Sequence, residues 1–403
     1  MQSGNWRTPA IVLACGALIL TLSMGVRQSM GLFLPPMTLE FGWGRSTFAF
    51  AMALSNLVWG AFQPMLGAIA DRSGAGRVLA VCALIYAAAL ALMPMSSTGP
   101  LLDLTAGAML GVGMAGVAFG VIMGVIGRAY PPHRRSFALG VASAGGSFGQ
   151  FVMLPVSQQL IATLGWKGAL LALALVVLAI VPLSVALVER AAAPAPAQEQ
   201  QSLGAALREA GAHAGFWYLT AGFFVCGFQV AFMQVHLPAY LQDQGLSASV
   251  GAAALGLIGL FNIAGSFLAG YLGGRYSKKY LLSIIYLARA VIIALFLLAP
   301  ISPLGVYAFA AAIGFLWLGT VPLTNGLVAQ IFGVRYLSTL FGIVFFSHQI
   351  GSFLGAWVGG WLFDLTGSYG PVWIGAIVLA LAAALINLPI DERPAQRTAP
   401  VPA

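Results

Sequence analysis

The feature that most constrains this chain is a recurrence of apolar runs of roughly 20 residues, each long enough to cross a bilayer as a helix. The chain has 403 residues, of which 60% are hydrophobic and only 7% are charged. Soluble domains carry about 25% charged residues, and no soluble core could bury so many apolar runs. The sequence therefore predicts a polytopic membrane protein.

Twelve such runs occur along the chain, and each is expected to form a membrane-spanning helix. They cover residues 9–34, 47–70, 78–97, 101–128, 136–163, 167–188, 215–242, 248–272, 280–299, 303–330, 337–364 and 370–389. The first run is too long for the core of a signal peptide, so we expect it to remain as the first span. An even number of spans places both termini on the same side of the membrane.

A polar segment separates the sixth run from the seventh. Residues 191–214 contain Ala-Pro-Ala-Pro-Ala and Gln-Glu-Gln-Gln, a composition typical of a linker. We therefore expect an all-α membrane protein made of two similar six-helix bundles, residues 1–190 and 215–390. A short tail, residues 391–403, follows the second bundle.

The basic residues are distributed unevenly between the two predicted sides. Of the 18 Lys and Arg residues, Arg27 and Arg289 lie inside spans, Arg45 and Lys167 lie on one side, and the remaining 14 lie on the side of the termini. Since cytoplasmic loops carry the excess of Lys and Arg, this asymmetry predicts cytoplasmic termini, linker and tail in a cell (inner or plasma) membrane. It also explains the net charge of +8 without a nucleic-acid-binding patch.

The two predicted halves contain similar loops. The segment 67–77 follows the second span, and the segment that begins at Gly270 follows the eighth span, 203 residues later. Gly140 and Gly342 are 202 residues apart. A constant offset near half the chain length indicates an internal repeat, as found in transporters built from two parallel halves around a central cavity.

The segment 67–77 resembles the loop signature of the major facilitator superfamily. The matching residues are Gly67, Asp71, Arg72, Gly74 and Arg77. The resemblance extends over essentially the whole chain, and it implies a cytoplasmic latch that holds the halves together when the transporter faces outward. In the second copy Gly274 replaces the acidic residue, so a latch there, which would include Arg275, is expected to be weaker. The alternative is a plain turn with stop-transfer charges.

A second stretch resembles the signature of the monocarboxylate transporter subgroup, including its bacterial relatives. The matching residues are Tyr130, Arg134, Arg135, Ala138, Gly140, Ala142 and Gly145, whereas Pro131, His133 and Phe137 differ. In that subgroup helix eight carries an acidic and a basic residue, and here Asn262 and Ser266 stand in their places. The resemblance therefore implies that an anion-binding Arg comes from another helix or is absent.

Ionisable residues inside the spans are candidate functional residues, because a charge at mid-bilayer costs at least about 2.5 kcal/mol. Four are expected away from the span ends: Arg27, Arg289, His236 and His348, whereas every Asp and Glu maps to a loop, the linker or a helix end. A cavity lined by Arg and His without acids has a positive potential, which favours an anion over a cation.

The two intramembrane arginines have different settings. Arg27 lies beside Gln28 in the outer half of the first span, next to the position where the resembled subgroup has a substrate-linked Lys. It is predicted to bind substrate or assist coupling, with snorkelling to the interface as the alternative. Arg289 lies near the middle of the ninth span, either as a cavity-facing anion site or as a structural partner of helix ends or lipid headgroups.

His236 is the best candidate proton carrier and His348 is a further one, because histidine titrates near neutral pH. Pro238, two residues after His236, predicts a break at which the seventh span could bend. For each histidine the alternative is a neutral side chain that joins two helices. Further polar candidates for substrate binding, each of which could equally join helices, are Gln28, Asn56, Gln150, Gln229, Asn262 and Asn325.

These features together predict a secondary transporter for a small organic anion, in particular a monocarboxylate, moved by alternating access with proton coupling. Carboxylate exchange is the alternative among transporters, and a non-transporting membrane sensor is the alternative of another class. The sequence contains no evident nucleophile–base pair, metal-ligand cluster or phosphate loop, so we expect no enzyme, cofactor or metal site. The expected partners are the substrate, protons and the lipid bilayer, without nucleic acid, and the expected state is a monomer.

Overall fold

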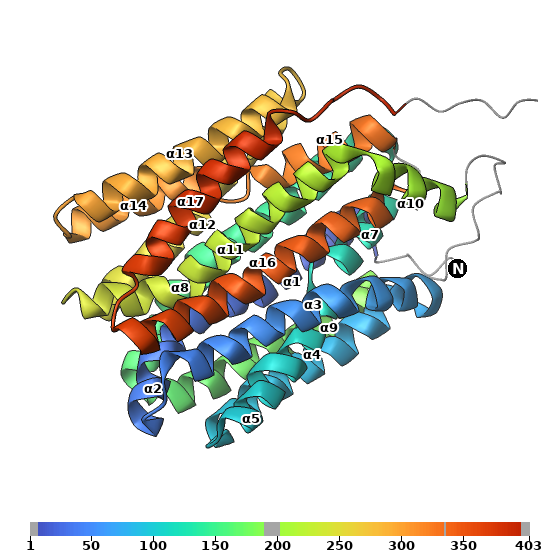
Figure 1. The fold of residues 1–403 in the computed structure, drawn as a ribbon. Helices are drawn as coiled ribbons and strands as arrows, with labels where there is room; N and C mark the ends of the chain where they lie inside the picture. The colour runs from blue at the N-terminus through green and yellow to red at the C-terminus, as the bar shows by residue number, and fades with distance from the viewer. Residues whose placement is uncertain (1–6, 189–201, 334–335, 396–403) are drawn as a thin grey trace, which may run out of the picture.

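The computed structural model describes residues 7–188, 202–333 and 336–395, apart from the side chains at 71–72, 132–133, 135–137 and 338. The described residues form helices that lie side by side along one common direction (Figure 1). The helix α10 (Leu203–Ala212) and the described tail residues 391–395 lie at one end of this bundle (Figure 1), which we call the terminal end. The opposite end is called the far end.

The first half of the chain forms the helices of the first six predicted spans. They are α1 (Pro9–Gln28), α2 (Leu34–Phe41), α3 (Arg45–Ser73), α4 (Ala75–Leu92), α5 (Gly99–Leu102), α6 (Leu110–Val117), α7 (Phe119–Ala129), α8 (Pro132–Leu178) and α9 (Ile180–Ser184). The 3-10 turn Met30–Phe33 joins α1 to α2, and the π-helical turn Asp103–Met109 joins α5 to α6. The first predicted span, residues 9–34, is therefore not one continuous helix. It consists of α1, the 3-10 turn and the first residue of α2.

The second half contains α10 and seven longer helices. They are α11 (Ala214–Asp243), α12 (Ala248–Gly273), α13 (Lys278–Leu298), α14 (Pro303–Phe315), α15 (Thr320–Phe332), α16 (Leu337–Thr366) and α17 (Gly370–Asn387). The predicted linker is helical in its second part, because the Ser202 hydroxyl accepts a hydrogen bond from the N–H of Ala205 and caps α10. Its first part, residues 191–201, lies outside the described residues.

Within the described residues, ten helical stretches are long and apolar enough to cross a membrane. One of them, Ala138–Leu187, makes two passes, because Gly165 turns the chain with a φ of 69° that favours glycine. Helix α3 adds a further pass as it runs alongside α16 (Figure 1). The described chain thus has the twelve predicted passes, and the all-α membrane fold is confirmed.

Two spans are interrupted where the sequence predicts continuous helices. The fourth span breaks at Ala118, whose backbone is extended between α6 and α7. The tenth span breaks between α14 and α15, at residues 316–319. These breaks place unpaired backbone groups inside the membrane, where they require partners from other helices.

The predicted break of the seventh span at Pro238 is wrong, because α11 is continuous from Ala214 to Asp243. Proline at this position still removes the hydrogen bond to the carbonyl of Gln234, four residues earlier. That carbonyl lies against Gly31 of the first half: a Cβ built at Gly31 would be 2.0 Å from the Gln234 oxygen. The proline therefore helps to form a close helix contact instead of a bend.

The internal repeat is visible in the polar contacts that hold the broken spans. In the first half, the Ser23 hydroxyl donates to the carbonyl of Val117 (3.2 Å). In the second half, Cys226 contacts the hydroxyl of Thr320 at the same distance of 3.2 Å. Each member of the second pair lies 203 residues after its counterpart, so the two halves brace their broken spans in the same way.

Candidate functional site

Arg27 lies in the last turn of α1 and is only 8% exposed. Its guanidinium donates a hydrogen bond to the side-chain oxygen of Asn56 in α3 and lies 5.7 Å from the centre of the Trp59 ring. No carboxylate among the described residues pairs with it. The structure therefore buries a cation among neutral partners, which leaves its charge available to an anion.

One face of α3 supplies the groups around Arg27. Asn56, Trp59 and Gln63 follow one another at i, i+3 and i+7, a spacing that places them on the same side of a helix. The indole N–H of Trp59 and the side-chain oxygen of Gln63 are buried and have no hydrogen-bond partner in the protein. Trp59 thus offers a second donor near the guanidinium.

The opposite half of the molecule reaches this face through α16. Gln349 donates a hydrogen bond from its side-chain amide to the backbone carbonyl of Asn56 (3.0 Å). Its own side-chain oxygen lies 3.2 Å from Nδ1 of His348. Arg27 and His348 are therefore connected across the two halves through Asn56 and Gln349.

Aromatic rings extend from this polar group along α16. The ring of Trp59 meets Phe345 edge-on at 6.0 Å, and Phe345 stacks on His348 at 5.8 Å. Phe223 of α11 lies 4.9 Å from the same imidazole. The candidate site thus combines a buried cation with a flat apolar wall.

Arg289 has the contacts of a structural side chain. It is 1% exposed and donates to the backbone carbonyls of Leu316 (2.8 Å) and Trp317, in the break of the tenth span. It also donates to the side-chain oxygen of Gln229 (3.2 Å). The sequence leaves Arg289 either as a cavity-facing anion site or as a structural partner of helix ends or lipid headgroups. These contacts favour the pairing with helix ends.

Asn262 holds the same break from α12. Its side-chain oxygen accepts from the backbone N–H of Leu318 (2.9 Å), and its amide donates to Ser147 of α8 (2.9 Å). The amide of Gln229 donates to the Ala376 carbonyl (2.9 Å), and Gln150 donates to the Leu255 carbonyl (2.8 Å). The described contacts of these three predicted substrate residues therefore join helices.

Two other predicted substrate residues are less engaged. The side-chain oxygen of Gln28, next to Arg27, is buried without a protein partner. Asn325 is half-buried on α15, and no hydrogen bond joins its side chain to another described residue. Of these two, only Gln28 is adjacent to Arg27 in the chain.

His236 lies with residues of the far end rather than with Arg27. It is fully buried, and its two ring nitrogens contact the Tyr369 hydroxyl (2.9 Å) and the Ala356 carbonyl (2.7 Å). Tyr369 also accepts a hydrogen bond from Arg45 (3.0 Å). The two candidate histidines therefore belong to separate groups of residues.

Arg45 joins the two halves at the far end, which the sequence analysis did not predict. Its guanidinium forms two hydrogen bonds with the carboxylate of Asp243, at 2.7 and 2.6 Å. Asp364 accepts from the backbone N–H groups of Arg45 and Ser46, both at 2.9 Å. The sequence does contain a signal for this contact. Asp243 and Asp364 lie at the ends of the seventh and eleventh spans, on the side of the membrane where Arg45 and Lys167 are the only basic residues.

The loop signature lies at the terminal end. Gly74 has a φ of 97° between α3 and α4, a conformation that explains why the signature requires glycine there. Arg77 is exposed, and Arg275 stacks on the Tyr271 ring at 4.1 Å. The side chains of Asp71 and Arg72 lie outside the described part of the chain, so the predicted latch remains a prediction.

The second signature follows the start of α8. Ala138 and Ala142 are buried, and a Cβ at Gly145 would lie 2.7 Å from the Ala17 carbonyl of α1. The absence of a side chain at Gly145 allows α8 to approach α1 closely. Of the polar members, Tyr130 ends α7 in an extended conformation and Arg134 is exposed, while the side chain of Arg135 lies outside the description.

The two ends of the bundle differ in how closely the halves approach. At the far end, Gly31 and Gln234 are too close to admit a Cβ. At the terminal end, a Cβ at Gly67 in α3, Gly140 in α8 or Gly342 in α16 would meet no atom within 4 Å. The halves are therefore in tight contact at Gly31 of the far end, whereas the described structure has open space beside these three glycines of the terminal end.

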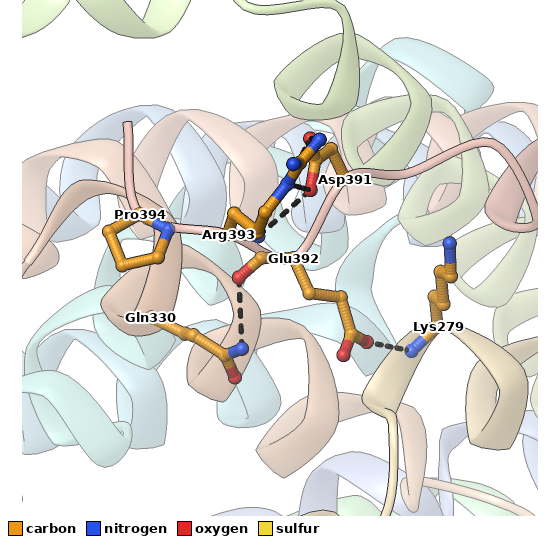
Figure 2. Close-up of a pocket in the computed structure, with 6 residues that line it drawn as sticks. All are labelled: Lys279, Gln330, Asp391, Glu392, Arg393 and Pro394. Atoms are coloured by element: carbon orange, nitrogen blue, oxygen red, sulfur yellow. Dashed lines mark hydrogen bonds and ion pairs between the residues drawn. The ribbon is translucent and has the colours of Figure 1, made fainter. Parts of the chain in front are cut away.

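A crevice of about 370 Å³ lies at the terminal end, away from Arg27, and Figure 2 shows its lining. The tail residue Glu392 accepts from the backbone N–H of Lys279 in the first turn of α13 (2.6 Å). Gln330 of α15 donates to the backbone carbonyl of Glu392 (2.9 Å). The crevice is thus a junction between the tail and two helices, and it contains none of the predicted substrate residues.

Comparison with known proteins identifies several relatives. The chain matches the profile described as Major Facilitator Superfamily over residues 13–355 and 262–403. It is 27% identical over 391 residues to the uncharacterized MFS-type transporter YcxA of Bacillus subtilis, covering 92% of this chain and 93% of the relative. It is 27% identical to monocarboxylate transporter 13 of Bos taurus (91% and 86% covered) and 28% identical to monocarboxylate transporter 11 of Homo sapiens (96% and 83% covered).

Among solved structures, the chain resembles a bacterial homolog of the human lysosomal transporter Spinster in an inward-facing and occupied conformation. The TM-score is 0.77 at 15% sequence identity, and the alignment covers 95% of this chain and 97% of the other. At this identity the likeness concerns the fold alone.

Proposed function

The chain belongs to the major facilitator superfamily and is a multi-pass membrane transporter rather than an enzyme, and we propose that it carries a small organic anion, in particular a monocarboxylate. The observation that carries this proposal is Arg27, a buried guanidinium with neutral partners only. An uncompensated cation in a membrane interior is costly, so a negatively charged substrate gains binding energy there. The relatives named monocarboxylate transporters support the same class of substrate.

The contacts around Arg27 support a carboxylate with a small apolar body. A guanidinium binds a carboxylate through two parallel hydrogen bonds, and the indole N–H of Trp59 supplies a further donor. The apolar part of the substrate would then lie along the rings of Trp59 and Phe345. Sugars need several hydrogen-bond partners around the ring, and this wall offers few.

The unequal ends of the bundle support a mechanism of alternating access. If the termini are cytoplasmic, as the basic residues indicate, the far end is extracellular and the structure corresponds to the inward-facing state. The substrate would reach Arg27 from the cytoplasm here, and from outside after the halves rock in the opposite direction. The cell membrane is the location that this orientation implies.

Proton coupling is the preferred driving force, with His348 as the first candidate carrier. Its ring nitrogen is linked to Arg27 through Gln349 and Asn56, so a proton on the imidazole and an anion on the guanidinium would influence each other. Histidine is suited to this role because it titrates near neutral pH. A net-neutral load of anion and proton crosses the membrane at lower electrostatic cost than the anion alone.

Binding of small carboxylates to the purified protein tests the proposal. We expect a monocarboxylate to raise the Tm of the wild-type protein and to have no effect on Arg27→Ala, because the cation that binds it is gone. Arg208→Ala removes an exposed charge from α10 and is the matched control, which should respond like wild type. Stabilisation by neutral sugars alone, or an undiminished carboxylate response in Arg27→Ala, would contradict the anion assignment.

A further inference from the structure

The far end is held closed by a chain of hydrogen bonds that begins at Arg45 and ends inside α16. The Arg45 guanidinium binds Asp243 and also donates to the Tyr369 hydroxyl (3.0 Å). The Tyr369 hydroxyl lies 2.9 Å from Nδ1 of His236, and Nε2 of His236 lies 2.7 Å from the Ala356 carbonyl. We call the four side chains of Arg45, Asp243, Tyr369 and His236 the far-end relay.

The chemistry of the partners fixes the direction of each hydrogen bond in the relay. A backbone carbonyl only accepts, so Nε2 of His236 carries the hydrogen and donates to Ala356. Neutral histidine must then accept at Nδ1, and the Tyr369 hydroxyl is the donor. Tyr369 in turn accepts from Arg45, which completes a single consistent sequence of donors.

A proton on His236 is incompatible with this sequence. Nδ1 of His236 would become a donor, and the Tyr369 oxygen would then have to accept from both His236 and Arg45. The tyrosine hydroxyl could no longer donate to the imidazole. The hydrogen bonds of the closed arrangement therefore match a neutral His236, whereas a charged His236 would leave the Tyr369 hydroxyl without its imidazole acceptor.

The charged groups that face the imidazole come from several helices and have opposite signs. Arg45 on α3 brings a positive charge toward it, while Asp364 on α16 acts in the opposite sense. Asp243 at the end of α11 is the remaining acid of the cluster, and both of its oxygens are bound to Arg45. Asp364 is likewise engaged by two backbone N–H groups at the start of α3, so neither acid offers an oxygen to the histidine.

The relay also connects the two halves directly. Arg45 belongs to α3 of the first half, whereas Asp243, Tyr369 and His236 belong to the second half. The Arg45 guanidinium lies 3.8 Å from the centre of the Phe363 ring, which adds a further contact across the halves. Opening of the far end must break these bonds and expose the relay to water, where a charged histidine is well solvated.

We propose that the far-end relay is a pH-sensitive latch in which Tyr369 transmits the protonation of His236 to the Arg45–Asp243 ion pair. The far-open state binds the proton better than the far-closed state, so acid outside the cell shifts the population toward the far-open state. The inference rests on the proposed function only for the statement that the far end is extracellular. It assigns His236 to gating and leaves the transported proton to another group.

Distances across the far end test the latch in lipid nanodiscs by electron–electron resonance of two spin labels. The labels are placed at Leu39→Cys on α2 and Gln244→Cys after α11, both exposed, with Cys15, Cys82 and Cys226 replaced by Ser. As the pH falls from about 8 to about 5, the ratio of the long to the short distance should rise roughly tenfold, a usual size for such linkage. A wild-type distance distribution that does not change with pH would overturn the proposal.

Three variants separate the relay from a general effect of acid. His236→Gln can still donate to Ala356 and accept from Tyr369 but cannot take up a proton, so its distances should stay short at every pH. Tyr369→Phe should also lose the pH response, because the ring remains and the connecting hydroxyl is removed. Tyr240→Phe is the matched control, since its ring lies 6.2 Å from that of Tyr369 without a place in the relay, and it should respond like wild type.

Retention of the pH response in His236→Gln would show that another group drives the opening, and it would contradict the latch. A failure of the latch proposal can be told apart from a failure of the proposed function. Proton-dependent carboxylate uptake with pH-independent far-end distances would contradict the latch and support the proposed function. A pH-dependent opening in a protein that binds no carboxylate would support the latch and contradict the proposed substrate.

Discussion

Gln349 in α16 donates a hydrogen bond of 3.0 Å to the backbone carbonyl of Asn56 in α3. Because Asn56 also accepts from Arg27, the candidate anion site of the first half is tied to a helix of the second half. An anion that competes with Asn56 for the guanidinium would therefore alter a contact between the halves. This gives substrate binding a direct physical route to the movement that transport requires.

The hydrogen bond of Gln349 should contribute to substrate affinity. Gln349→Ala removes a bond that typically contributes about 1 kcal/mol, so we expect roughly a fivefold weaker carboxylate affinity. Titration calorimetry of wild type and variant measures the change. An unchanged affinity would indicate that the bond plays no part in the site.

Arg289 should be required for stability rather than for anion binding. Arg289→Met keeps much of the side-chain volume but leaves the carbonyls of Leu316 and Trp317 without a donor, which we expect to cost about 3 kcal/mol. Arg275→Met, at an exposed position, is the control and should leave the Tm nearly unchanged. A normal Tm combined with a lost carboxylate response in Arg289→Met would instead place Arg289 in the substrate site.

The tail should stabilise the second half through Glu392. Glu392→Ala removes the acceptor at the start of α13, and losing such a cap costs about 1 kcal/mol, which a thermal melt detects.

The neighbouring Asp391 provides the comparison, because Arg393 lowers the pKa of this exposed carboxyl to about 2. A lowered pKa means that any stability from this pair is present at neutral pH and is lost only as the pH falls through about 4 toward 2. Asp391→Asn should therefore have a smaller effect than Glu392→Ala at pH 7, and the reverse order would contradict the capping role.

The glycines of α16 should tolerate substitution according to their surroundings. A Cβ at Gly355 would lie 2.1 Å from the Phe228 carbonyl of α11, so Gly355→Ala should separate the helices at a cost of about 2 kcal/mol. Gly342→Ala is the control on the same helix, because its Cβ would meet no atom within 4 Å. Thermal melts that rank the two variants in the opposite order would contradict the packing described here.

Much of the fold could be predicted because the membrane imposes simple rules. Hydropathy alone locates the twelve passes to within a few residues, apart from the first, since every span must satisfy its backbone internally. The interruptions at Ala118 and at residues 316–319 were missed, because a break is tolerated only when other helices supply partners. The sequence around the break does not name those partners, which here include Asn262 and Arg289.

The candidate site was only partly predictable for a related reason. Arg27 could be singled out because an arginine inside an apolar span is costly and has few possible explanations. The relay of Arg45, Asp243 and Tyr369 was missed, because it depends on contacts between segments some 200 residues or more apart. His236 was predicted to carry the transported proton from its residue type and its place inside a span, yet neither of these tells which residues of other helices it meets.

Uptake into proteoliposomes tests the central claim most directly. Wild-type protein should accumulate a labelled monocarboxylate when the proton gradient is directed inward, and Arg27→Ala, reconstituted to the same level, should not. Counterflow from preloaded vesicles without a gradient separates exchange from proton symport. Uptake of a neutral sugar in place of any carboxylate, or carboxylate uptake that is the same with and without Arg27, would contradict the account.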